Sequence, residues 1–218
     1  MISIIVYNNL PASQGRTVMI GWINCWEYAN LIPSTGYRGR MSVPRKLSLI
    51  KSSVGSYQLI QQPVKEFDAL RKEVFSTSDQ KVDSVLDLSF HGDAYELDIT
   101  MATTDATTGI KILKSKNEAT VLKYDPSAQT LSLDRTKSGD LSFSPKFSSI
   151  ETVAVIPQNG LVTLRILVDK RIVTAFINEG ESVITDQVFP LGREGGIQLF
   201  SEGGRSVFKS VKIYAINM

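Results

Sequence analysis

Apolar and polar residues alternate in short runs through the second part of the chain, from about residue 76 onward. In the clearest run, residues 95–101, large apolar side chains occupy every second position and polar ones lie between them. This period of two is typical of a strand with one face in a hydrophobic core. Similar runs occupy residues 109–113, 119–124, 130–133, 151–155, 161–168, 172–178, 184–189, 195–200 and 206–216. Turn residues separate these runs, and about ten strands at this spacing predict a two-sheet β-sandwich.

The first 62 residues contain fewer strands. Apolar runs at 2–7 and 16–22 are separated by the turn sequence NNLPASQG. Residues 41–53 and 56–62 predict a hairpin around Gly55. About four strands correspond to one blade of a β-propeller, which is too little to form a domain alone.

Residues 63–75, PVKEFDALRKEVF, are the one stretch with a helical pattern. Apolar residues recur at spacings of three and four between Val64 and Val74, and a proline suits the first turn of a helix. The sequence therefore predicts an all-β chain in three parts. These are a remnant of one propeller blade at 1–62, a linker with a short helix at 63–75, and a lectin-like sandwich at 76–218.

The amino-acid composition limits the kinds of partner and metal site that the chain can have. The 24 Lys and Arg residues against 22 Asp and Glu give a net charge of +2, which is too balanced to favour a nucleic-acid partner. Cys25 and His91 are the single cysteine and the single histidine, so no internal disulfide and no site with several Cys or His metal ligands is expected. His91, in SFHGDAY, is interpreted as a surface-turn residue. No metal and no cofactor is predicted.

No apolar run reaches the length of about 18 residues that a membrane span needs, so no membrane partner is expected. The N-terminal run MISIIVYNNLP has no preceding basic residues and is interpreted as a strand rather than a signal peptide. The cellular location is left open.

The segment 21–47, GWINCWEYANLIPSTGYRGRMSVPRKL, gathers most of the unusual chemistry. Trp22, Trp26 and Tyr28 alternate as residues on one face of a strand do, with Asn24 among them. Such a face suits a sugar, whose C–H groups lie against flat rings while polar side chains bond its hydroxyls. A core strand with a few polar neighbours is an equally good interpretation, because aromatic residues are commonly buried.

These motifs also carry a resemblance. GWINCWEYANLIP, followed by YRGRMSVPRKLSL and QQPVKE, resembles the last propeller blade of glycoside hydrolase family 32, the β-fructosidases that include invertases, levanases and inulinases. Three later runs are similar to the C-terminal β-sandwich of that family: DRTKSGDLSF, LRILVDKRIVTAFINEGESVITDQVFP and GGIQLFSEGG with FKSVKIY. The resemblance implies a five-bladed propeller that carries the active site, with this sandwich behind it.

The resemblance also implies that the catalytic carboxylates of the family are absent from this sequence. Family members are retaining hydrolases, which need a carboxylate nucleophile and a carboxylic acid/base. In the family these carboxylates, with a further aspartate, sit in Asn-Asp-Pro-Asn, Arg-Asp-Pro and Glu-Cys motifs on earlier blades. None occurs in this sequence, since Tyr124 precedes Asp125-Pro126 and Asn24 precedes Cys25. No catalytic residue is therefore assigned, and the chain alone is expected to be inactive, with the other four blades missing.

One residue of the family's substrate pocket carries over. Trp26 matches the second tryptophan of the family's Gly-Trp-x-x-Asn-Trp motif, which borders the fructose pocket, and Asn24, Tyr28 and Arg38 lie beside it in the sequence. These four residues are the predicted substrate-binding set.

The sequence departs from the family at several positions. Cys25 stands where the family usually has Asn, Tyr37 where it often has Trp, and Lys46 where it often has Glu. In the sandwich, RIVT at 171–174 replaces the usual Ser-Ser-Val-Glu, so Thr174 stands in place of a glutamate. The loss of that glutamate puts the contacts with the propeller in doubt.

Three functions remain open. The first is a non-catalytic C-terminal portion of a β-fructosidase that supports the propeller structurally, arising from a truncated or split gene or from expression of one segment. The second is a module that binds fructan or fructose through the aromatic face. The third is an assembly role, in which the unpaired edges and apolar face of a lone blade pair with a second copy or with a separate N-terminal propeller chain.

Overall fold

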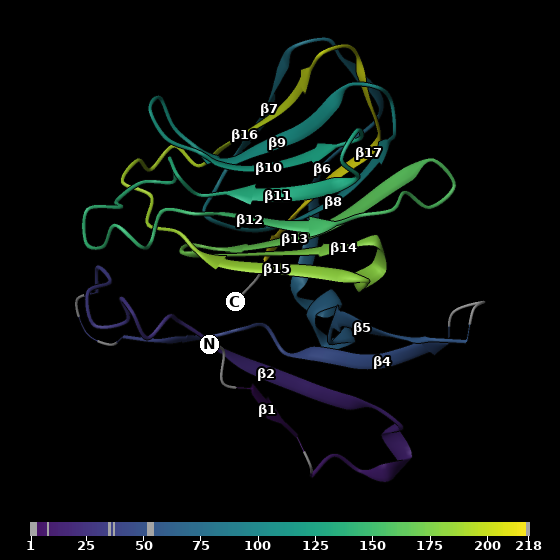
Figure 1. Ribbon diagram of the computed structural model, residues 1–218, viewed down its shortest axis with the longest axis vertical. Coiled ribbons are helices and arrows are strands. Elements are labelled where there is room, and N and C mark those ends of the chain that lie inside the picture. The colour runs from purple at the N-terminus through teal and green to yellow at the C-terminus, as the bar shows by residue number, and fades with distance from the viewer. Residues whose placement is uncertain (1–3, 8, 35, 37, 52–54, 217–218) are drawn as a thin grey trace.

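The computed structural model describes residues 4–7, 9–34, 36, 38–51 and 55–216. The strands of these residues form three antiparallel sheets. A small blade sheet lies below a larger two-sheet sandwich in Figure 1. The blade sheet has the order β1-β2-β4-β5, and a short β3 also pairs with β2. Its strands are β1 (Ile4–Val6), β2 (Thr17–Ile23), β3 (Arg40–Met41), β4 (Arg45–Lys51) and β5 (Tyr57–Pro63).

The sandwich consists of two sheets of six strands each, with the orders β12-β11-β10-β9-β16-β7 and β15-β14-β13-β8-β17-β6. The first half of its strands are β6 (Arg71–Val82), β7 (Val85–His91), β8 (Ala94–Ala102), β9 (Thr107–Lys114), β10 (Thr120–Asp125) and β11 (Thr130–Asp134). The second half are β12 (Ile150–Ala154), β13 (Leu161–Asp169), β14 (Ile172–Ile177), β15 (Ser182–Gln187), β16 (Gly196–Glu202) and β17 (Ser206–Ile216). The predicted all-β sandwich is confirmed.

Side-chain alternation places the core between the two sandwich sheets. In β10 and β11 every second residue is buried, and the register pairs Leu122 with Leu133 and Tyr124 with Leu131. The Asp125 side chain closes this hairpin, because its Oδ1 accepts the backbone N–H of Ser127 at 2.9 Å. The opposite sheet contributes fully buried residues of the same core, with Tyr95, Leu97, Met101 and Phe208 the largest.

The helix predicted at 63–75 is wrong in length and type. A 3-10 helix, η2, spans Lys65–Leu70, and the chain is already in strand β6 from Arg71. Residues Arg71–Val82 pair with the long strand β17, so hydrogen bonding along the sheet edge overrides the local three-to-four spacing.

The aromatic segment also differs from its predicted form. Strand β2 ends at Ile23, and the chain then turns through Cys25 to Ile32, so Trp22, Trp26 and Tyr28 do not share one strand face. The predicted hairpin around Gly55 is present as β4 and β5, although its residues 52–54 lie outside the described part of the chain.

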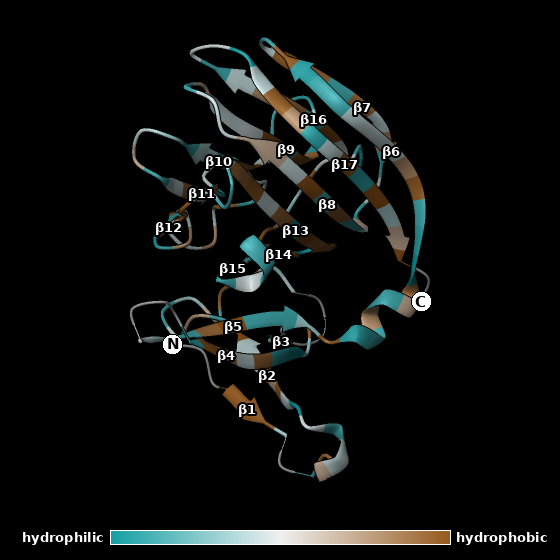
Figure 2. Cartoon of the chain, turned by 90° about the vertical axis from the view of Figure 1, so that its right-hand side faces the viewer, coloured by the Kyte–Doolittle hydropathy of each residue, from teal (hydrophilic) through white to brown (hydrophobic). Residues whose placement is uncertain are grey.

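The blade sheet docks against the end of the sandwich that β15 and η3 (Asn178–Gly180) form. Gly180 has φ +89°, and a Cβ there would lie 1.9 Å from the Gln61 carbonyl oxygen, so only glycine permits this approach. A second, smaller cluster of buried residues, Tyr28, Ile32, Phe147 and Phe189, joins the turn after β2 to loops of the sandwich. The blade is thus held by both a close backbone approach and apolar packing. Figure 2 shows the blade sheet below the β14–β15 end of the sandwich.

Candidate functional site

Trp22 and Trp26 form an aromatic pair at the end of β2. Their ring centroids lie 5.1 Å apart with the planes tilted by 44°, and Trp26 is 73% exposed. Gly39 packs against this pair, because a Cβ at position 39 would lie 2.7 Å from Trp22 Nε1. Trp26, the residue that matches the family motif, is therefore exposed to solvent while its ring packs on Trp22.

Arg38 lies near the same pair. With Trp22, Met41 and Asp169 it lines a shallow cavity of about 460 Å³. The Arg38 side chain is exposed, so its guanidinium is available to a ligand that covers the tryptophans. Trp22 thus contacts the Trp26 ring and also lines the cavity that Arg38 borders.

The other two predicted residues are buried on the opposite side of the turn. Asn24 is 8% exposed, and its Oδ1 accepts the backbone N–H of Cys25 at 2.9 Å. Tyr28 is equally buried, and its ring meets Phe147 edge-on at a centroid distance of 5.5 Å. The expected platform of Trp22, Trp26 and Tyr28 is thus not formed, because Tyr28 packs into the interface between blade and sandwich.

Asn24 and Tyr28 instead line a cavity of about 430 Å³ between blade and sandwich, which we call the interface cavity. Its other lining residues are Ile23, Cys25, Arg135, Glu151, Thr152, Val153, Val183, Ile184, Thr185, Asp186 and Gln187. Arg135 donates from Nη2 to the Tyr28 hydroxyl at 3.3 Å and pairs through Nη1 with Asp186 Oδ1, also at 3.3 Å. One arginine of the sandwich therefore connects the blade to β15.

Burial dominates the electrostatics of this cavity. Desolvation raises the pKa of Asp186 to about 6, although the nearby Arg135 guanidinium opposes the shift. Desolvation likewise raises the pKa of Tyr28. Sequence reasoning missed Arg135 and Asp186 as site residues, since their proximity depends on the pairing of distant strands. The run DRTKSGDLSF, which contains Arg135, was the available signal.

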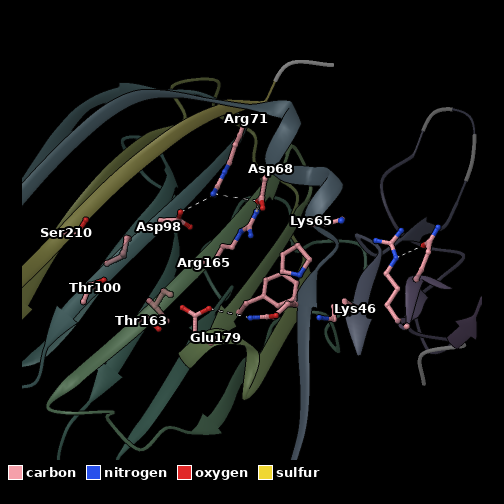
Figure 3. A pocket seen from close by; sticks show the side chains of 18 residues that line it. Lys46, Lys65, Asp68, Arg71, Asp98, Thr100, Thr163, Arg165, Glu179 and Ser210 are labelled. Atoms are coloured by element: carbon pink, nitrogen blue, oxygen red, sulfur yellow. Dashed lines mark hydrogen bonds and ion pairs between the residues drawn. The ribbon is translucent and has the colours of Figure 1, made fainter. Parts of the chain in front are cut away.

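A third hollow, of about 630 Å³, lies where η2 and the blade meet β8 and β13 (Figure 3). Arg165 and Arg71 converge there on Glu96, whose side chain is fully buried. Asp68 also pairs with Arg165, at 2.8 Å. Desolvation raises the pKa of Glu96 despite both arginines. In this network both carboxylates, Glu96 and Asp68, are paired with arginines. The Asp68–Arg165 pair joins the linker to the sandwich.

Few other groups offer reactive chemistry. His91 is exposed at the end of β7, as predicted for a surface residue, and its Nδ1 lies 2.9 Å from the Glu194 carbonyl oxygen. The described residues contain no group of three or more His, Cys, Asp or Glu side chains arranged to hold a metal ion. Among the helices of the described chain, none has the length and apolarity to cross a membrane.

A propeller-type blade sheet docked on a two-sheet sandwich defines a two-module architecture. Comparison with known families gives the same division. Residues 66–215 match the family described as Glycosyl hydrolases family 32 C terminal, and residues 6–63 match the Glycosyl hydrolases family 32 N-terminal domain. The chain belongs to glycosyl hydrolase family 32.

Relatives of the chain include a levanase and an exo-inulinase. The chain is 32% identical over 221 residues to a levanase of Bacillus subtilis, which spans 96% of this chain and 32% of the relative. It is 33% identical over 221 residues to the extracellular exo-inulinase of Aspergillus niger, covering 96% of this chain and 40% of the relative. The chain thus spans between about a third and two fifths of the length of these curated relatives.

Solved structures share the fold. The crystal structure of exo-inulinase from Aspergillus awamori superposes with a TM-score of 0.89 at 29% identity, covering 98% of this chain and 42% of that one. Fructan 1-exohydrolase IIa from Cichorium intybus gives a TM-score of 0.77 at 18% identity, covering 98% and 47%, which shows the fold alone.

Proposed function

We propose that this chain is a non-catalytic portion of a retaining β-fructosidase, which completes and supports a propeller that carries the catalytic carboxylates. Retaining hydrolysis requires two carboxyl groups about 5–5.5 Å apart on either side of the scissile bond. The sequence contains none of the family's three carboxylate motifs. In the hollow beside η2, Glu96 and Asp68 are engaged by arginines. Hydrolysis would therefore need residues that this sequence does not supply.

The observation that carries the proposal is the apolar surface of the blade. Of the seventeen large apolar side chains exposed in the described residues, eleven lie between Ile4 and Leu59. Strand β1 is exposed along its whole length, and Leu49 and Tyr57 are 66% and 67% exposed on the β4–β5 hairpin. An exposed strand edge and an apolar face are surfaces on which further strands pack.

The proposed occupant of that surface is the rest of a family 32 propeller. Residues 6–63 match the N-terminal domain of the family, and the chain covers only part of the length of its relatives. A second copy of this chain is the competing occupant. The sandwich would act as a rigid base, because Arg45 and Gly180 fix the blade on it.

Fructose release tests the proposal. We expect the purified chain to release no fructose from levan, inulin or sucrose, and to support release when it is co-expressed with the part of a family 32 levanase propeller that precedes the blade matched by residues 6–63. Enzyme-like release by the chain alone would refute the proposal, as would a co-expressed propeller whose activity is unaffected by the chain.

A second candidate function is fructan binding at the Trp22–Trp26 pair. The exposed Trp26 ring packs on Trp22, which lines a cavity together with Arg38, so this surface offers both a stacking face and a hydrogen-bond donor. Isothermal titration with levan oligomers is expected to give a heat of binding that Trp26→Ala abolishes. Tyr57→Ala, which removes an equally exposed ring from the hairpin, is the matched control and should leave binding unchanged. Absence of heat with the unaltered chain would eliminate this function.

A further inference from the structure

The interface cavity contains polar atoms whose hydrogen bonds are not satisfied within the described chain. Asn24 Nδ2, Asp186 Oδ2 and Gln187 Nε2 each have no hydrogen-bond partner there. All three side chains belong to residues that line this cavity, and their exposed fractions are 8%, 8% and 3%. A buried polar group without a partner costs about 1–3 kcal/mol, so three in one cavity indicate a site whose ligand would supply the missing bonds.

The surrounding bonds fix the role of each atom. Asn24 Oδ1 already accepts the Cys25 N–H, so Nδ2 is the end of the amide that remains to donate. Asp186 Oδ1 faces Arg135, so Oδ2 is the oxygen that remains to accept. The cavity therefore combines two amide donors with one carboxylate acceptor. A hydroxyl group matches this combination, because one O–H both accepts from an amide and donates to a carboxylate.

The charges that line the interface cavity and the volume of the cavity define the class of ligand further. The positive charge of Arg135 is balanced by Asp186, and Glu151 adds a further carboxylate, so the lining does not favour an anion. The cavity volume of about 430 Å³ lies within the usual range of small-molecule sites. We propose that the interface cavity binds a neutral polyhydroxylated molecule, between a triol and a monosaccharide in size, which bridges the blade and the sandwich. This site is separate from the Trp22–Trp26 surface and does not depend on the proposed function.

The single cysteine provides a direct probe of occupancy. Cys25 lines the cavity and is partly exposed, so a bound ligand would shield its thiol from alkylation. We would measure the rate of Cys25 alkylation by iodoacetamide in the whole chain with increasing glycerol, glucose or fructose. At about ten times the dissociation constant, labelling should slow about tenfold, because only the unbound fraction reacts. Comparing the three polyols distinguishes a triol site from a monosaccharide site.

Matched variants separate binding from general stabilisation by polyols. Gln187→Met removes the unsatisfied amide, while the Gln187 backbone carbonyl that accepts from Arg135 is retained. Gln198→Met removes an amide of similar burial on β16, which bonds Asp87 and does not line the cavity. Saturable protection in the unaltered chain and in Gln198→Met, lost in Gln187→Met, is the expected result. Unsaturable slowing that is equal in all three proteins, or no slowing by any polyol, would show that water alone fills the cavity and would overturn the proposal.

Discussion

Arg45 on β4 donates a hydrogen bond from Nη2 to Thr185 Oγ1 on β15 at 2.6 Å and thereby joins the blade to the sandwich. Its Nη1 donates to Gln61 Oε1 at 3.0 Å, and the residue is 8% exposed. Both of these acceptors are neutral, and desolvation lowers the pKa of Arg45 to about 10. The buried Arg45 guanidinium at this junction therefore donates these two hydrogen bonds to uncharged oxygens, those of Gln61 and Thr185.

Restoring a carboxylate at this junction should strengthen it. Thr185 Oγ1 donates to Thr174 Oγ1 at 3.2 Å, and Thr174 is the position where the sequence lacks the family's usual glutamate. We expect Thr174→Glu to raise the pKa of Arg45 and to increase the free energy of unfolding by about 1–3 kcal/mol, as a charge-assisted hydrogen bond does. Urea unfolding at neutral pH measures this change.

Thr174→Gln has the same length without the charge and is the control for that experiment. It should stabilise the chain less than Thr174→Glu does. Equal effects of the two substitutions, or a loss of stability in the glutamate variant alone, would show that Arg45 does not lack an anionic partner.

The close approach at Gly180 predicts a large cost for any side chain there. Gly180→Ala would place a methyl group 1.9 Å from the Gln61 carbonyl oxygen. Gly203 has a similar φ of +78°, but no atom lies within 4 Å of its ideal Cβ, so Gly203→Ala is the matched control. We expect Gly203→Ala to lose about 1–2 kcal/mol of stability from backbone strain alone. Thermal unfolding should show a clearly larger loss for Gly180→Ala, and equal losses would contradict the close contact.

Asp186 predicts a distinctive dependence of stability on pH. Its pKa is raised to about 6 in the folded chain, so as pH falls from 7 toward 4 the folded state takes up a proton before the unfolded state does. Protonation of Asp186 should therefore stabilise the fold, by up to about 3 kcal/mol over this interval. The neighbouring charges, Arg135 and Glu151, modify this effect in opposite directions.

Comparison with Asp186→Asn isolates that contribution. Other carboxylates, such as Asp125 and Asp140, have lowered pKa values and weaken the fold as pH falls, but they are common to both proteins. The difference in unfolding free energy between unaltered chain and variant should shift in favour of the unaltered chain between pH 7 and pH 4. A difference that is constant with pH would contradict the raised pKa.

The buried Glu96 makes Arg165 important for stability. Arg165 Nε lies 2.9 Å from Glu96 Oε1, and the Glu96 side chain has no exposed surface. Arg165→Met should lower the free energy of unfolding by about 2–4 kcal/mol, because the buried carboxylate keeps only Arg71 as a cationic partner. Lys209→Met, which breaks a surface pair with Asp79, should cost much less, because water screens an exposed ion pair. Chemical denaturation that gives similar values for both would refute a structural role for the Glu96 network.

Much of the sandwich could be predicted from the sequence because buried and exposed positions alternate in several of its strands. In β11 the inward residues Leu131 and Leu133 alternate with polar ones, and this signal is local. The linker could not be predicted in the same way. Its apolar spacing suited a helix, but residues from Arg71 onward pair with β17, a strand distant in the sequence, with Arg71 opposite Ile216.

The candidate site was predictable only in part. Trp26 and Arg38 are exposed, as expected of residues that contact a ligand. Asn24 and Tyr28 are turned into the interface because β2 ends at Ile23, and no residue pattern marks that end. The partner of Tyr28, Arg135, is 107 positions away and becomes a neighbour only through the docking of the two modules.

If the other blades of a propeller dock on the exposed blade, the molar mass in solution will show it. Light scattering coupled to size exclusion would be run on the chain alone, on the separately produced first four blades of a family 32 propeller, and on their mixture. We expect a single species in the mixture, with a mass equal to one copy of each. Two species that elute at their separate masses, or a dimer of this chain that leaves the propeller unbound, would contradict this docking.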